Sequence, residues 1–186
     1  MESSKGKRLF IAFKLPQEIK VDLNKLLKEL KSSTRGVKWC DSQNLHITLH
    51  FLGSQDEKSE LAIISIMQSL AGKLGQIKFK LGQIGGFPDL KNPRVIFIAC
   101  QQINGGSAVS WRSLLGFRLV DLGLAPDRRA WQTHLTLGRV KDGVKINLPV
   151  NLAVPKAEFA LNTFELMASK LTPSGAEYKI VASFAL

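Results

Sequence analysis

Apolar and polar residues alternate most clearly in residues 44–53, which read Asn-Leu-His-Ile-Thr-Leu-His-Phe-Leu-Gly. Side chains two positions apart on a β-strand project from the same face of a sheet. Leu45 and Ile47 therefore share one face, and His46 and Thr48 share the other. The pattern predicts a strand that buries its aliphatic face and presents an imidazole beside a hydroxyl on the opposite face.

A second stretch, residues 132–139, repeats this arrangement with the sequence Gln-Thr-His-Leu-Thr-Leu-Gly-Arg. His134 and Thr136 share one strand face there, and leucines occupy the other. The chain contains three histidines, and two of them take the same place in the same local pattern. A single such histidine would more often be a packed or solvated residue than a catalyst. Two matched ones, from different halves of the chain, indicate a paired site.

The rest of the pattern predicts shorter strands and three helices. Apolar or alternating runs predict strands over residues 9–15, 37–40, 77–81, 94–100, 157–171 and 178–186, of which 157–171 is bent or interrupted. Apolar residues at steps of three and four predict helices whose buried stripes cover residues 19–30, 61–74 and 111–119. Pro16 opens the first helix, and residues 54–57 resemble a capping box for the second. Glycine and proline predict turns at residues 85–88 and 172–175.

This order of elements lacks the regular strand–helix–strand rhythm of a doubly wound sheet, and several strands are hairpin neighbours. We therefore expect an α+β fold with mainly antiparallel sheets. The doubled His-x-Thr pattern predicts a bilobal molecule, in which two pseudo-symmetric lobes carry their helices on the outside and face a central cleft. A chain of 186 residues can bury a sizeable core, so residues 1–186 are expected to form one domain with two lobes, and a monomer.

Charge narrows the class of ligand. The chain has 26 lysines and arginines against 15 aspartates and glutamates, a formal net charge of +11. A field of this sign attracts polyanions and raises their encounter rate. The basic residues are scattered, so many are solvated surface, but nucleic acid or a nucleotide is favoured over a neutral ligand.

The cysteines and the hydropathy indicate a reducing compartment. Cys40 and Cys100 show no zinc-binding or redox spacing, so both are expected to be buried free thiols. Residues 1–8 are polar and lack the apolar core of a signal peptide. No run approaches the roughly 20 apolar residues that a membrane helix needs. These observations predict a cytoplasmic protein that engages no membrane.

Two imidazoles, one from each lobe, suit displacement at phosphorus. The incoming and departing oxygens lie on opposite sides of the phosphorus atom, so one histidine can act as a base and the other as an acid. The unperturbed imidazole pKa of about 6.5 serves both roles. The hydroxyls of Thr48 and Thr136 can donate to the non-bridging oxygens. His46 and His134 are thus the candidate catalytic residues, and the two threonines are candidate phosphate ligands.

A metal site is the main chemical alternative. His46 and His50 share a strand face, but residues four apart on a strand are separated by about 13 Å and cannot both reach one zinc ion without a bulge. A site built from His46, His134 and a distant carboxylate stays open but has no supporting spacing. No G-x-S-x-G motif appears, and neither cysteine stands in a recognisable nucleophile context. We therefore expect no metal and no cofactor.

The sequence resembles the two-histidine (2H) phosphoesterases, and within them the RNA 2′,3′-cyclic phosphodiesterases, also called 2′-5′ RNA ligases. The two His-x-Thr motifs are the specific part of the resemblance. Supporting matches run almost from end to end of the chain: Arg8 to Ala12, Leu15-Pro16, Trp39, Asn44 to Leu49, Phe51-Leu52-Gly53, Gly86-Phe87-Pro88, Arg94-Val95, His134 to Arg139, Ser169-x-Leu171, Gly175 and Tyr178.

The resemblance implies a bilobal α+β fold with a positively charged cleft. It also implies metal-independent opening of 2′,3′-cyclic phosphate ends of RNA, or of a related nucleotide, to 2′-phosphomonoesters, and it allows reversible 2′-5′ ligation. By resemblance, His46 protonates the departing O3′ and His134 activates water. The residues themselves do not distinguish the acid from the base.

The fifth residue after each histidine, Phe51 and Arg139, is also implied, the first to stack on a nucleobase and the second to contact phosphate. Strict alternation, however, places both on the core face. They reach the site only if each strand ends or bulges first, which Gly138 would permit. His50 stands at a position that is often basic in the family. Parity places it on the cleft face, where it would assist substrate binding or be a solvated strand residue.

Two other functions stay open at the level of sequence. A non-catalytic RNA-binding module would use the same basic cleft, although such a module has no need for matched histidines. A related two-histidine enzyme would act on small cyclic nucleotides instead of RNA.

Overall fold

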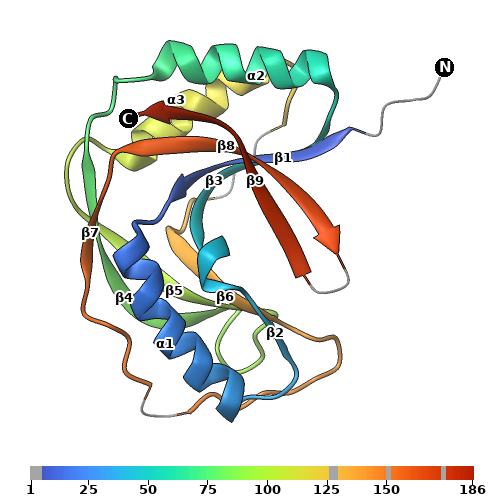
Figure 1. The fold of residues 1–186 in the computed structure, drawn as a ribbon, viewed down its shortest axis with the longest axis vertical. Helices are drawn as coiled ribbons and strands as arrows, with labels where there is room; N and C mark the ends of the chain where they lie inside the picture. The colour runs from blue at the N-terminus through green and yellow to red at the C-terminus, as the bar shows by residue number, and fades with distance from the viewer. Residues whose placement is uncertain (1–5, 126–129, 150–151, 173–174) are drawn as a thin grey trace.

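The computed structural model describes residues 6–125, 130–149, 152–172 and 175–186, and these form two sheets and three α-helices (Figure 1). The first sheet holds, in order, the strands β3 (His46–Gln55), β1 (Lys7–Lys14), β8 (Thr163–Thr172) and β9 (Gly175–Ala185). The second holds β2 (Val37–Trp39), β6 (His134–Val140), β5 (Val95–Asn104), β4 (Ile77–Phe87) and β7 (Glu158–Leu161). Neighbouring strands of both sheets are antiparallel. The predicted α+β fold with two similar lobes is confirmed.

Two of these three helices lie against a sheet other than that of the strand that precedes them. The helix α1 (Gln17–Ser33) follows β1 of the first sheet but lies against the second, whereas α2 (Glu57–Leu70) and α3 (Ala108–Val120) cover the first (Figure 1). On α3, Trp111 packs edge-on against Phe164 of β8, with ring centroids 4.5 Å apart. The rings of Phe13 on β1 and Phe79 on β4 lie 6.5 Å apart and join the two sheets. Residues of both sheets thus belong to one apolar core.

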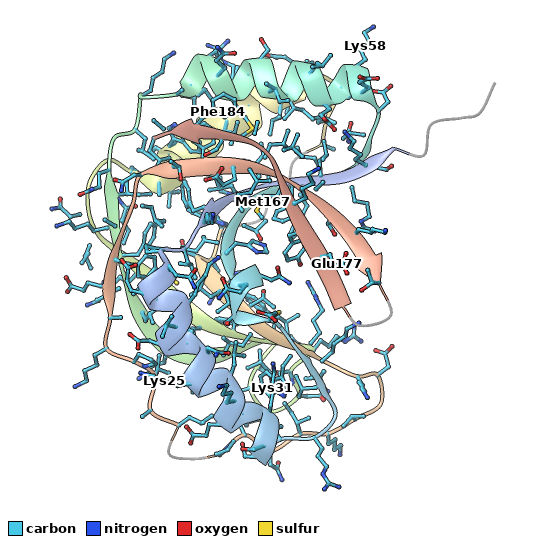
Figure 2. All side chains as sticks on the ribbon, in the orientation of Figure 1. Lys25, Lys31, Lys58, Met167, Glu177 and Phe184 are labelled. Atoms are coloured by element: carbon cyan, nitrogen blue, oxygen red, sulfur yellow. The ribbon has the colours of Figure 1, made fainter. Side chains whose placement is uncertain are left out.

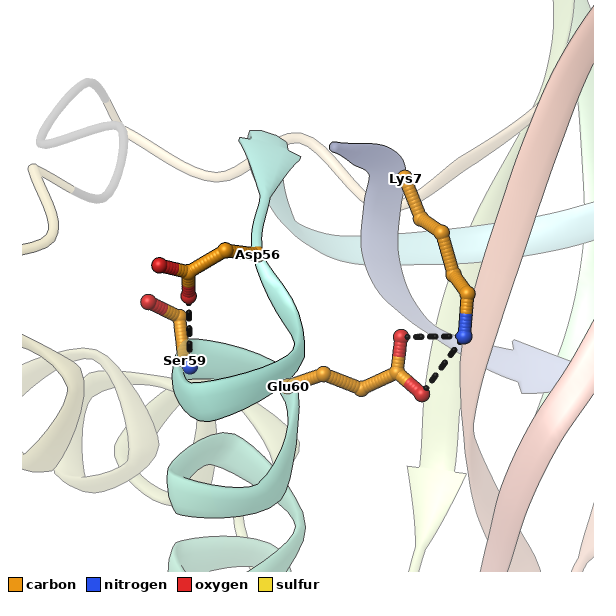
Figure 3. A network of polar contacts seen from close by, with 4 residues as sticks. All are labelled: Lys7, Asp56, Ser59 and Glu60. Carbon is orange, nitrogen blue, oxygen red and sulfur yellow. Dashed lines mark hydrogen bonds and ion pairs between the residues drawn. The ribbon is translucent and has the colours of Figure 1, made fainter. Parts of the chain in front are cut away.

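Polar contacts fix the start of α2 (Figure 3). The carboxylate of Asp56 accepts a hydrogen bond from the backbone N–H of Ser59 at 2.8 Å and caps the helix. The Nζ of Lys7 lies 3.0 Å from each carboxylate oxygen of Glu60 and joins the helix to β1. The predicted capping box placed the cap at Ser54, which is wrong because β3 continues to the residue before Asp56.

The predicted turn at residues 85–88 is also wrong, because β4 continues through two glycines to Phe87. Gly85 pairs with Phe97 of β5. A Cβ atom on Gly85 would come within 2.4 Å of the Phe97 ring. The glycine therefore makes room for an aromatic ring on the strand surface instead of ending the strand.

The interruption predicted within residues 157–171 is confirmed, since the chain leaves the second sheet at Leu161 and enters the first at Thr163. Of the turn predicted at residues 172–175, residues 173 and 174 lie outside the described residues, and the flanking strands β8 and β9 pair with each other. No helix in the described part of the chain has the length and apolarity needed to cross a membrane.

A β-bulge interrupts β3 directly after the first His-x-Thr motif. In the pairing with β1, His50 lies opposite Ile11 and Thr48 lies opposite Ala12, so Leu49 is an extra residue on β3. An extra residue shifts the alternation of side chains beyond it to the other face.

The second motif strand carries a matching bulge. In the pairing of β6 with β5, Gly138 lies opposite Ile96 and Thr136 lies opposite Phe97, so Leu137 is the extra residue. A Cβ atom on Gly138 would come within 2.8 Å of the Trp39 ring on β2. The glycine thus permits close approach of β2 where the strand bulges.

Candidate active site

Each motif histidine is held by the backbone carbonyl two residues before it. The Nδ1 atom of His46 lies 2.7 Å from the carbonyl oxygen of Asn44, and that of His134 lies 2.6 Å from the carbonyl oxygen of Gln132. A carbonyl oxygen can only accept, so Nδ1–H is the donor in both rings. The neutral form of each ring then leaves Nε2 without a proton, as the atom that can accept one and later give it up.

The His46 ring packs against two aromatic side chains of the first sheet. Its centroid is 4.8 Å from that of Phe10 on β1 and 5.2 Å from that of Tyr178 on β9, which meets it edge-on. Burial lowers the pKa of His46 to about 4, and the positive charges of Lys20 and His134 act in the same direction, against the raising effect of the Asn44 carbonyl. His46 is therefore neutral at pH 7 in the free protein.

The His134 ring has an equivalent setting in the second sheet. Its centroid lies 5.2 Å from that of Phe97 on β5 and 5.1 Å from that of Phe87 on β4. Burial lowers the pKa of His134 and the Arg139 guanidinium acts in the same direction, while the Gln132 carbonyl raises it. A neutral imidazole with a free Nε2 is the form that a general base requires.

The two motif strands lie against each other across the lobes. The indole Nε1–H of Trp131, three residues before His134, donates to the carbonyl oxygen of Thr48 at 3.0 Å. Thr48 and Thr136 are half-buried, each beside its histidine and between fully buried core residues. The structure therefore brings together, at the junction of the two sheets, the two strands that carry these histidines and threonines.

A buried arginine satisfies the backbone at the first bulge. The Nε–H of Arg112 on α3 donates to the carbonyl oxygen of Leu49 at 2.9 Å, and its guanidinium lies 5.6 Å from the centroid of the Trp131 ring. A bulged residue does not pair with the neighbouring strand, and a buried carbonyl needs a partner. At the second bulge, the backbone N–H of Cys40 plays this part by donating to the Leu137 carbonyl at 2.7 Å.

The prediction that His50 faces the cleft is wrong. Because Leu49 bulges, His50 turns inward, where its side chain is 2% exposed. Its Nε2–H donates to the backbone carbonyl of Arg112 at 2.9 Å. His50 thus attaches α3 to β3, and it does not line the cavity described below.

The same shift brings out the two residues that strict alternation had placed in the core. Phe51 is 63% exposed, and Arg139, beyond the second bulge, is exposed as well. Both line one cavity together with His46. The condition set by the sequence, a bulge before each of these residues, is met in both strands.

This cavity, of about 750 Å³, opens on the His46 side of the junction. One wall is formed by β8 and β9, and the other by the end of α1, β2 and the segment that follows it. Figure 2 labels one residue on each wall, Lys31 on α1 and Glu177 on β9. Four basic side chains line the cavity against two acidic ones: Arg8, Lys31, Lys38 and Arg139, with Asp41 and Glu177.

The described residues contain no group of three or more histidine, cysteine, aspartate or glutamate side chains able to hold a metal ion. Both cysteines are free thiols. Burial raises the pKa of the Cys100 thiol to about 12 and also raises that of Cys40. A thiol of this kind is not a nucleophile at neutral pH.

Several residues of the site carried no sequence signal of their role. The carbonyls of Asn44 and Gln132 belong to the backbone, so side-chain identity does not reveal them. Arg112 lay within a predicted helix, where an arginine is ordinarily solvated. Only the packing of α3 against β3 shows that its side chain is buried.

The chain is similar to known proteins over nearly its whole length. A family model described as LigT like Phosphoesterase matches residues 13–97. The RNA 2′,3′-cyclic phosphodiesterase of Methanocaldococcus jannaschii is 33% identical over 179 residues, covering 94% of this chain and 98% of that protein. The protein of the same name from Archaeoglobus fulgidus is 33% identical over 183 residues, covering 95% and 99%.

Among solved structures, TT0787 of Thermus thermophilus superposes with a TM-score of 0.80 at 26% identity, over 96% of this chain and 97% of that one. The LigT protein of E. coli superposes with a TM-score of 0.76 at 20% identity, over 98% and 99%, and so shares the fold.

Two antiparallel sheets that present paired imidazoles at their junction are the architecture of a two-histidine phosphoesterase. Within that class, the chain belongs to the LigT-like phosphoesterase family, together with the RNA 2′,3′-cyclic phosphodiesterases to which it is similar over nearly its whole length.

Proposed function

We propose that this protein hydrolyses 2′,3′-cyclic phosphate ends of RNA to 2′-phosphomonoesters, without a metal or cofactor, through His46 and His134. The observation that carries the proposal is the matched geometry of the two rings. Each imidazole is held through Nδ1–H by the carbonyl two residues before it, which leaves Nε2 for proton transfer in both lobes.

In the proposed reaction, a water oxygen attacks phosphorus while the P–O3′ bond breaks on the opposite side. Nε2 of His134 takes a proton from the water, and the protonated Nε2 of His46 gives one to the departing O3′. The product has a free 3′-hydroxyl and a phosphate that stays on O2′. If a 5′-hydroxyl of a second RNA takes the place of water, the same site forms a 2′-5′ linkage.

The position of the cavity supports His46 as the acid. The departing O3′ belongs to a ribose that needs space on the acid side, whereas attacking water needs little. His46 lines the cavity of about 750 Å³ together with Phe51. The nucleoside would therefore occupy the His46 side, with the water next to His134.

The negative charge of the substrate would favour protonation of His46. Burial keeps His46 neutral in the free protein, with a pKa of about 4. A phosphodiester carries a negative charge, and an anion within about 4–6 Å of an imidazole raises its pKa. Binding of substrate would thus favour the protonated form of His46 at the moment when its proton is needed.

The remaining roles follow from position. The hydroxyls of Thr48 and Thr136 would donate to the non-bridging oxygens, where transition-state charge is spread. Phe51 would stack on the terminal base, and Arg139 would contact phosphate, since both line the cavity with His46. We infer that the protein works as a monomer in the reducing cytoplasm, and that it engages no membrane.

The test is to incubate the protein with an RNA that ends in a 2′,3′-cyclic phosphate and to identify the monoester by ³¹P NMR. A 2′-phosphate is expected, with full activity in EDTA. His46→Ala and His134→Ala should each lower kcat by at least about 10²-fold, while circular dichroism shows a folded protein. A 3′-phosphate product, or near-normal rates in both variants, would refute the proposal.

A further inference from the structure

The cavity beside His46 extends well beyond the reacting ring. Tyr178 contacts His46, and the cavity wall continues along β9 to Ala176, which pairs with Leu171 of β8. Two residues along a strand span about 7 Å. The volume of about 750 Å³ lies in the upper part of the roughly 300–1,000 Å³ range of small-ligand pockets, and it gives more room than one nucleoside phosphate fills.

Resting on the proposed function, we propose that the outer part of this cavity binds the nucleotide that precedes the cyclic-phosphate end. The substrate is then an oligonucleotide, and a mononucleotide fills only the inner part. The outer part is defined by Lys31, Lys38, Trp39, Leu171 and Ala176. The inner part is defined by His46, Phe10, Tyr178 and Phe51.

Charge in the outer part suits the phosphate that joins the last two nucleotides. Lys38 on β2 pairs with Arg139 on β6, so the cationic surface runs from the reacting phosphate towards the outer part. Lys31, near the end of α1, lines the same cavity as Lys38 and Cys40. Both lysines are exposed. They can therefore bind a backbone phosphate without a cost of burial.

Exposed apolar side chains give each part of the cavity a surface for a base. Phe51 is 63% exposed and its ring lies 6.3 Å from that of Phe10, which contacts His46, so it serves the inner part. Leu171 is 69% exposed and lies two positions beyond Ser169, the partner of Tyr178. Bases bind such surfaces by stacking and apolar contact, which tolerates any sequence. Two separated apolar surfaces therefore match two successive bases.

The experiment compares three substrates: adenosine 2′,3′-cyclic phosphate, and the dinucleotide and trinucleotide of adenosine with the same cyclic end. The kcat/KM of the dinucleotide is expected to exceed that of the mononucleotide by about tenfold or more, since one stacked base alone accounts for about that factor. The third nucleotide should increase kcat/KM by a smaller factor than the second. Equal values for the mononucleotide and dinucleotide would overturn the inference and leave the proposed function standing.

Lysine variants test whether the outer part of the cavity causes the preference for the dinucleotide. Lys31→Ala and Lys38→Ala, combined, should lower kcat/KM for the dinucleotide about tenfold and change that for the mononucleotide less than about twofold. Lys28→Ala, which removes an exposed lysine of α1 outside the cavity, should change neither value. Equal losses on both substrates would contradict the outer site.

Binding tests the inference even without turnover. If no cyclic end is hydrolysed, the proposed function fails. Calorimetry with 2′-AMP and with the dinucleotide 2′-phosphate then still measures the outer part. Tighter binding of the dinucleotide, lost in the Lys31 and Lys38 double variant, supports the inference, and equal binding overturns it.

Discussion

The Nε–H of Arg112 donates to the carbonyl oxygen of Leu49 at 2.9 Å, and this hydrogen bond joins α3 to the bulge in β3. The bulge reverses the alternation of β3, which turns Phe51 out to the cavity and His50 into the core. Trp131 donates to the neighbouring Thr48 carbonyl and lies beside the Arg112 guanidinium. One side chain of a helix and one of a loop thus hold the strand that carries the first motif.

Trp131→Phe should lower kcat by about tenfold with a smaller change in KM. The substitution keeps an aromatic ring but removes the N–H that binds the Thr48 carbonyl, a loss of about 1 kcal/mol in stability. The matched control is Trp111→Phe, which replaces a buried indole on α3, outside the cavity, by a smaller ring. It should lower the melting temperature but leave kcat unchanged. Equal effects of the two variants on kcat would show that Trp131 only stabilises the fold.

The pH dependence of kcat/KM should reflect the lowered histidine pKa values. Both pKa values lie below 6.5 in the free protein, and the reaction needs His46 protonated and His134 neutral. At pH values above both pKa values, the fraction of protein in this reactive protonation state falls about tenfold per pH unit. The kcat/KM should therefore decline above about pH 6.5. The kcat profile should lie at higher pH, because bound phosphate raises the pKa of His46. A kcat/KM that stays level between about pH 6 and about pH 9 would contradict this assignment.

Stability should fall in acid partly because of His46. Its pKa is about 4 when folded and about 6.5 when unfolded, so only the unfolded chain binds this proton between those values. The contribution is present above pH 6.5 and is lost as the pH falls towards 4. The free energy of unfolding, measured with urea, should differ between the wild type and His46→Gln by a constant amount above about pH 7. Below about pH 6, this difference should shift in favour of the variant. Parallel curves over the whole range would show that the pKa is not lowered.

Phe51→Ala should raise KM about tenfold by removing a stacking surface, with stability changed by less than about 0.5 kcal/mol because the ring is 63% exposed. Phe117→Ala is the matched control, since Phe117 is 67% exposed on α3 and lies outside the cavity. It should leave KM unchanged. If both variants behave alike, Phe51 does not contact the substrate.

Much of this molecule can be predicted from local pattern. Alternation placed His46 and Thr48 on one strand face and His134 and Thr136 on another, because the two-residue period of a strand is a property of the backbone. The same reasoning predicted three helices and mainly antiparallel sheets. The repeat of one motif in two halves of the chain indicated two lobes.

Local pattern did not place the residues beyond each motif. A bulge depends on which carbonyls find partners across the fold, and the partners here are Arg112 and the backbone of Cys40. Strict alternation therefore assigned His50 to the wrong face. Phe51 and Arg139 could reach the site only if a bulge preceded each of them, and the sequence alone did not show whether the bulges form. The tautomer of each imidazole likewise depends on a carbonyl that side-chain identity does not reveal. Periodicity determines which faces a strand has, but the packing of distant segments decides where that periodicity breaks.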